Sequence, residues 1–171
     1  MIKWRFCRRW GHTSKLCGCI GGAMTVLTML IVRWASGSPY FFLSQLKATS
    51  IGLPVWLISL IWLAWYFVMG FLWGMLLGDI RNRTLVRAVW FYRGSLYFML
   101  GIFMGLMWYP FLFRICMPFF SLLVLLSSVA FLCVAGISWM HIHRSCGYLT
   151  LGYCLWLVFI LLTQLVVVLN N

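Results

Sequence analysis

The chain has 171 residues, of which 65% are hydrophobic and 8% charged, with thirteen Lys or Arg residues and a single acidic residue, Asp79. Soluble domains carry roughly 25% charged residues, so this composition predicts an integral membrane protein. One carboxylate cannot form the catalytic pair of a glycosidase or an aspartic protease, which excludes both enzyme classes. The net charge of +12 is divided into short basic runs beside apolar segments, which favours contact with membrane lipid over binding of nucleic acid.

Five apolar segments are long enough to cross a membrane. A spanning helix needs about 20 such residues, because the hydrocarbon layer is roughly 30 Å thick and a helix rises about 1.5 Å per residue. The sequence therefore predicts an all-α fold, an integral membrane bundle of five transmembrane helices. Residues 1–16 form a basic N-terminal segment and residues 17–171 the transmembrane domain, with helices at about 17–32, 54–77, 89–113, 117–140 and 147–169.

The N-terminal segment allows two further interpretations. Basic residues before an apolar run also begin a signal peptide, and small residues at 35–38 would suit a cleavage site. We expect the first helix to be retained, for a reason given below. The group Cys7, His12, Cys17 and Cys19 has the spacing C-x4-H-x4-C-x-C, which fits no common zinc finger or ribbon. We predict no metal site and no resident cofactor.

The longest connection covers residues 34–54 and is rich in Ser, Gly and Pro, with aromatic residues at 40–42. A connection of this composition is predicted to pack across the bundle as a lid. Pro54 then suits the first turn of the second helix, where its missing N–H costs nothing. Further along, Arg114 and Pro118 mark a tight turn between the third and fourth helices.

Basic residues are distributed unequally between the two ends of the predicted bundle. One end receives ten of the thirteen, and the other receives Arg33, Lys47 and Arg114. By the positive-inside rule, the N-terminus is cytoplasmic and the C-terminus outside. Arg93 is expected to extend its side chain to the membrane interface. His141 and His143 lie in a basic loop, where a charged membrane edge is a simpler interpretation than haem ligation.

The segment IWLAWYFVMGFLWGM, residues 61–75, has tryptophans in its middle, whereas membrane proteins concentrate this residue at the interfaces. At 100° per residue, Trp62, Tyr66 and Trp73 fall on one helical stripe. These rings, together with Trp108 and Trp156 from other helices, could converge on a flat conjugated ligand such as a tetrapyrrole or a sterol. The alternative is that the rings only fill space between helices.

The stretch IWLAWYFVMG resembles the second helix of the TspO/MBR proteins, also called tryptophan-rich sensory proteins or translocator proteins. The preceding LKATSIGLPVWLISLIW is similar to the family pattern L-x-K-P-x-x-x-P-P-x-W-x-x-x-x-x-W, with Pro54, Trp56 and Trp62 in register. Two further blocks resemble the family patterns F-x-x-Q-L-x-L-N-x-x-W-S-P and P-Y-x-x-W-x-x-F-A-x-x-L-N, the first at Trp108 and the second at Trp156. The resemblance implies a five-helix bundle that retains its first helix.

Several positions depart from the family patterns. The Gln and Asn of the third-helix pattern become Gly101 and Gly105, and the last pattern has Gly152 in place of Pro. These changes remove buried amides that would hold a ligand. The resulting G-x-x-x-G step favours either a homodimer interface at Gly101 and Gly105 or close packing within the bundle.

The resemblance implies a membrane receptor, sensor or carrier that binds tetrapyrroles, such as porphyrin or haem-related molecules, or similar flat apolar ligands. One alternative is a light-dependent porphyrin-degrading enzyme, in which Trp62 and Trp156 would be the reactive residues; another is an accessory membrane protein with no small ligand. No other catalytic residue is predicted. The expected partners are the flat ligand, membrane lipid and a second copy of the chain, with no nucleic acid. The expected ligand-binding residues are Trp56, Trp62, Tyr66, Trp73, Trp108, Tyr153 and Trp156.

Overall fold

The computed structural model describes residues 12–37, 55–79 and 85–170. Over these residues the chain is helical, with no strand. Five of the helices are long and apolar enough to cross a membrane, which confirms the predicted all-α bundle. The elements in chain order are α1 His12–Ala35, α3 Val55–Gly78, α4 Leu85–Tyr109, the π-helical turn η2 Pro110–Arg114, α5 Pro118–Met140 and α6 Arg144–Asn170.

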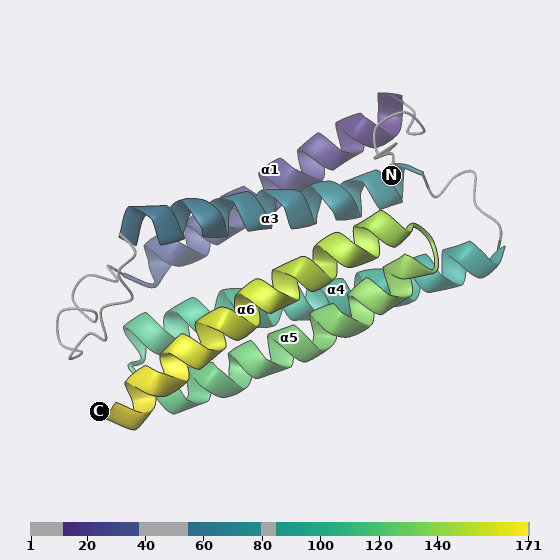
Figure 1. Cartoon of the computed structure of the whole chain (residues 1–171). Coiled ribbons are helices and arrows are strands. Elements are labelled where there is room, and N and C mark those ends of the chain that lie inside the picture. The colour runs from purple at the N-terminus through teal and green to yellow at the C-terminus, as the bar shows by residue number, and fades with distance from the viewer. Residues whose placement is uncertain (1–11, 38–54, 80–84, 171) are drawn as a thin grey trace.

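The helices form two layers (Figure 1). α1 packs along α3 in one layer, and α5 packs against both α4 and α6 in the other. The backbones of α3 and α6 approach each other much less closely than these pairs do. Large side chains therefore fill the space between the layers. We call the end of the bundle where α1 finishes and α5 begins the Arg114 end, and the opposite end, at the α5–α6 turn, the His141 end.

Small residues bring α1 and α3 into close contact. A Cβ atom built on Gly74 would lie 3.0 Å from the Cα of Gly18, so a side chain at this position would push the two backbones apart. The hydroxyl of Thr25 donates a hydrogen bond of 2.8 Å to the carbonyl oxygen of Tyr66, which joins the helices at the same face. The residues without a side chain at this contact are Gly18, Gly21 and Gly22 on α1 and Gly70, Gly74 and Gly78 on α3.

Three helices begin earlier than the apolar pattern predicted. α1 starts at His12 rather than at 17, because Ser14 is buried in its first turn and a Cβ on Gly78 would lie 2.8 Å from the Cα of Ser14. α4 starts at Leu85 rather than 89, and α6 at Arg144 rather than 147. Hydropathy marks the residues that suit lipid, whereas the hydrogen-bonded helix continues through polar residues beyond them.

The third predicted helix changes form at Pro110, which has no N–H to donate to the turn before it. The backbone widens into η2, where the N–H of Ile115 donates to the carbonyl oxygen of Pro110 at 2.9 Å. Cys116 then adopts a left-handed φ of 56°, and α5 begins at Pro118, which confirms the predicted tight turn. Because of this turn, Arg114 faces α1, where its Nη1 donates to the carbonyl oxygen of Ala35 at 3.2 Å.

Aromatic and basic side chains cover the His141 end. The Arg93 guanidinium lies 5.5 Å from the centre of the Trp90 ring, and the His141 ring stacks on the same indole at 4.2 Å. The predicted lid falls mostly on residues 38–54 and the basic segment mostly on residues 1–11, and both ranges lie outside the described residues. Cys7 is among them, whereas the rest of the chain as described holds no cluster of three or more metal-ligating side chains.

Candidate ligand-binding site

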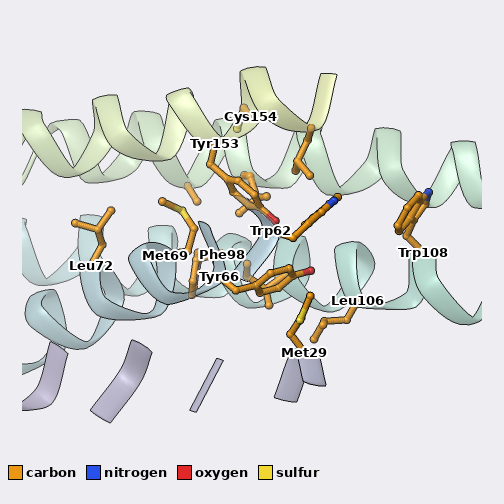
Figure 2. Close-up of a cluster of buried hydrophobic side chains, with 14 of the residues drawn as sticks. Met29, Trp62, Tyr66, Met69, Leu72, Phe98, Leu106, Trp108, Tyr153 and Cys154 are labelled. Atoms are coloured by element: carbon orange, nitrogen blue, oxygen red, sulfur yellow. The ribbon is translucent and has the colours of Figure 1, made fainter. Parts of the chain in front are cut away.

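Trp62 occupies the centre of the space between the two layers (Figure 2). Its side chain is buried and its ring stacks on Tyr66 at 5.9 Å and on Trp108 at 5.8 Å between ring centres. It meets Tyr109 at 6.0 Å and Trp156 at 6.4 Å in edge-to-face geometry. Helices α3, α4 and α6 thus place rings around one indole, in the offset and perpendicular arrangements that aromatic pairs prefer.

Tyr153 on α6 extends this group. Its ring is buried, meets Tyr66 edge to face at 6.3 Å and lies 5.5 Å from Trp65. Stacking therefore joins the two layers, although their backbones are well separated. We call Trp62, Tyr66, Trp108, Tyr109, Tyr153 and Trp156 the aromatic cluster.

The structure brings together five of the seven residues expected to bind ligand, namely Trp62, Tyr66, Trp108, Tyr153 and Trp156. Trp73 lies in a second stack, with its ring 6.4 Å from that of Phe98. Eleven residues separate Trp73 from Trp62, which is about 16 Å along a helix axis. The side chain of Trp56 lies outside the described residues. Ligand contact by Trp56 and Trp73 stays a prediction.

Polar atoms of the aromatic cluster are buried without partners. The Tyr66 hydroxyl and the Trp156 indole N–H have no hydrogen-bond partner within the part of the chain that the structure describes. A buried polar group left unpaired costs about 1–3 kcal/mol, so such groups call for an explanation. Both atoms are donors, and a flat ligand with acceptor atoms would satisfy them.

The absence of the family's Asn at position 105 explains why the Tyr66 hydroxyl is one of these unpaired donors. A Cβ on Gly105 would lie 3.5 Å from the Tyr66 hydroxyl and 3.2 Å from Ser128 Oγ, so the Asn of the family pattern would reach both. Here the Ser128 hydroxyl donates instead to the carbonyl oxygen of Gly101 at 2.8 Å. Gly101 and Gly105 therefore pack inside one chain, against α5 and the aromatic cluster. A homodimer through these two glycines stays a prediction.

Gln164 is a polar residue of the site that sequence reasoning missed. Its Oε1 accepts a hydrogen bond of 2.6 Å from the Trp108 indole, and its Nε2 donates to the carbonyl oxygen of Pro118 at 3.0 Å and to Ser121 Oγ. This buried amide joins α4, α5 and α6. Two signals could have found it: a glutamine inside an apolar span, and its place eight residues after Trp156, where the family pattern has Asn.

Comparison with known proteins matches nearly the whole chain to one family. The model of the TspO/MBR family matches residues 18–169, a range that begins within α1 and ends within the last turn of α6. No curated protein matches the sequence, and no solved structure matches either. The match extends well beyond the motif residues and includes most of the first helix. The chain therefore belongs to the TspO/MBR family.

Proposed function

We propose that this integral membrane protein is a receptor or sensor that binds a tetrapyrrole, or a similar flat apolar molecule, at the aromatic cluster. The observation that carries the proposal is the position of Trp62, whose ring meets rings from three helices at 5.8–6.4 Å. A flat conjugated ligand can replace such ring contacts with contacts of the same kind. The Tyr66 hydroxyl and the Trp156 N–H then donate to its acceptor atoms.

A titration with protoporphyrin in detergent and in darkness tests this proposal. Tryptophan quenching should saturate in the native protein, and the midpoint should rise about tenfold in the double variant Trp62→Phe with Trp156→Phe, because two ring contacts are weakened. Trp90→Phe is the matched control, since Trp90 lies at the His141 end and stacks on His141. A midpoint that is unchanged in the double variant, or quenching that never saturates, would contradict the proposal.

A second candidate is an enzyme that degrades porphyrin in light. The contact between Trp62 and Trp156 favours it, because the two tryptophans that the family resemblance links with this activity lie 6.4 Å apart, edge to face. Illumination of the bound complex should then produce a new absorption band in the native protein and none in the double variant. A spectrum that stays constant in light would leave the receptor as the function.

A further inference from the structure

Two cysteine side chains meet where α5 packs against α6. The Cys154 side chain is buried, and the Cys133 side chain is partly exposed. The two thiols lie close enough to interact through a hydrogen bond between the side chains. Cys154 follows Tyr153 along α6, but the ligand site proposed above uses neither thiol. The pair therefore calls for a chemistry of its own.

The packing of α5 against α6 places these cysteines opposite each other. A Cβ built on Gly147 would lie 2.7 Å from the carbonyl oxygen of Gly136, so the two backbones touch near the turn that joins them. One turn further along, a Cβ built on Gly136 would lie 3.4 Å from the Cβ of Thr150. Because the helices are antiparallel, a further step of three residues along α5 and four along α6 pairs Cys133 with Cys154. A disulfide needs Cα atoms no more than about 7 Å apart, which helices in backbone contact provide.

The exposed side of Cys133 faces the interior of the membrane. The span that contains it runs from Pro118 to Met140, and Cys133 lies seven residues before its end, or about 10 Å along the helix axis. A partly exposed side chain at this depth contacts acyl chains rather than water. Charged oxidants such as oxidised glutathione stay in water, whereas hydroperoxides of acyl chains form within the membrane. The more exposed thiol is the one that such a reagent meets first.

We propose that Cys133 and Cys154 are a dithiol site that lipid-soluble hydroperoxides oxidise to a disulfide between α5 and α6. The Cys133 sulfur attacks the terminal oxygen of the hydroperoxide, the O–O bond breaks, and the thiol proton passes to the alkoxide, which leaves as an alcohol. The Cys154 sulfur then attacks the sulfenic acid on Cys133. The S–O bond breaks as the S–S bond forms, and the hydroxide takes the Cys154 proton and leaves as water. Each disulfide thus reduces one hydroperoxide by two electrons, with no part for the flat ligand.

A two-cysteine variant in lipid vesicles tests this site. It retains Cys133 and Cys154 and has Ala at the other five cysteine positions. Trypsin cuts the denatured chain after Arg114 and after Arg144, and no Lys or Arg lies between these two or follows Arg144, so each of the peptides 115–144 and 145–171 carries one cysteine. After treatment of the folded protein with cumene hydroperoxide, mass spectrometry should find the two peptides joined, and reduction should separate them.

The matched control retains Cys133 with Cys146, because Cys146 and Cys154 are both buried on α6. Cys146 lies eight residues before Cys154, about 12 Å along the axis, so the control should give about tenfold less of the joined peptides. A variant with Cys133 alone should form a sulfenic acid that dimedone traps. Oxidised glutathione should leave the pair of Cys133 and Cys154 reduced.

The disulfide should also raise the unfolding temperature by several degrees over that of the reduced protein, because it restricts the unfolded chain. The native chain is treated in parallel, and fragmentation of its joined peptides should place the bond between Cys133 and Cys154 even if the variants fold poorly. A bond elsewhere, or no bond at any hydroperoxide concentration, would overturn the inference. Equal linkage in the Cys146 control, or equal linkage by oxidised glutathione, would overturn it as well.

Discussion

At the scale of single residues, the buried amide of Gln164 connects three helices at the edge of the aromatic cluster. It accepts from the Trp108 indole and donates to Pro118 and Ser121, so it fixes the orientation of one ring that stacks on Trp62. Within lipid the loss of such a bond is not compensated by water, although measured contributions of interhelical hydrogen bonds remain modest.

Gln164→Leu should lower the free energy of unfolding by about 1–3 kcal/mol, because it leaves the Trp108 N–H buried and unpaired. Thermal unfolding in detergent measures the change. Thr163→Val is the matched control: it makes the neighbouring residue of α6 apolar, and the Thr163 hydroxyl donates to the carbonyl oxygen of Ile160 in its own helix. An unfolding temperature for Gln164→Leu as high as that of the control would contradict this account of the amide.

Residue periodicity predicted which rings face inward, but not what they contact. Trp62 and Tyr66 are both buried, as their common stripe on α3 indicated. Trp73 belongs to the same stripe, yet it stacks on Phe98 in a separate group. A stripe predicts the direction in which side chains point about the helix axis, but not how far apart they lie along it. The eleven residues from Trp62 to Trp73 cover a much greater length of helix than the width of one ring. The hydrogen bonds of Gln164 depend on three helices and could not be read from one segment.

At the scale of elements, the contact of α1 with α3 holds the upper layer of Figure 1 together. Gly70, Gly74 and Gly78 recur every four residues and face Gly21, Gly18 and Ser14 of α1 in turn, so the two backbones touch. The same contact also fixes one side of the aromatic cluster, because the Thr25 hydroxyl of α1 donates a hydrogen bond to the carbonyl oxygen of Tyr66. Packing of this kind is the usual means of joining helices in lipid, where no hydrophobic force drives them together.

Gly21→Ala should destabilise the fold by about 1–3 kcal/mol, because the new Cβ would meet the carbonyl oxygen of Gly70 and lie 3.3 Å from the Cα of Gly74. Gly152→Ala should leave stability unchanged or raise it by up to about 1 kcal/mol, since its Cβ would lie 3.6 Å from Trp65 and alanine favours a helix. Thermal unfolding distinguishes the two. The same loss in both variants would show that the α1–α3 contact has no special importance.

The five helices were predictable because lipid demands long apolar segments, and their composition is visible without a structure. Which helices pack against one another could not be predicted in this way. The step Gly101-x-x-x-Gly105 predicts self-association or close packing within the bundle, whereas it is the longer repeat from Gly70 to Gly78 that packs against α1. The structure places Gly101 under Leu132 of α5, where a Cβ would lie 2.6 Å from the Leu132 Cγ. Two small residues four positions apart predict that another helix packs closely there, but not which helix it is.

At the scale of the whole molecule, the unequal distribution of basic residues predicts an orientation, with the His141 end in the cytoplasm and the Arg114 end outside. Cys116 is exposed in the turn between η2 and α5, at the Arg114 end. A variant that retains Cys116 as its only cysteine should react with a membrane-impermeant maleimide in intact cells. With His143→Cys as the only cysteine, the protein should react only after lysis. The reverse pattern would invert the orientation.

The aromatic cluster joins two separated layers, so a ligand that binds there should stabilise the fold. A ligand that binds only the folded state at a hundred times its dissociation constant adds about 2.7 kcal/mol. The most direct measurement is therefore the unfolding temperature in detergent, in darkness, as a function of protoporphyrin concentration. The account predicts a rise of several degrees that saturates in the native protein and is lost in Trp62→Ala. No rise at any concentration, or the same rise in both proteins, would contradict it.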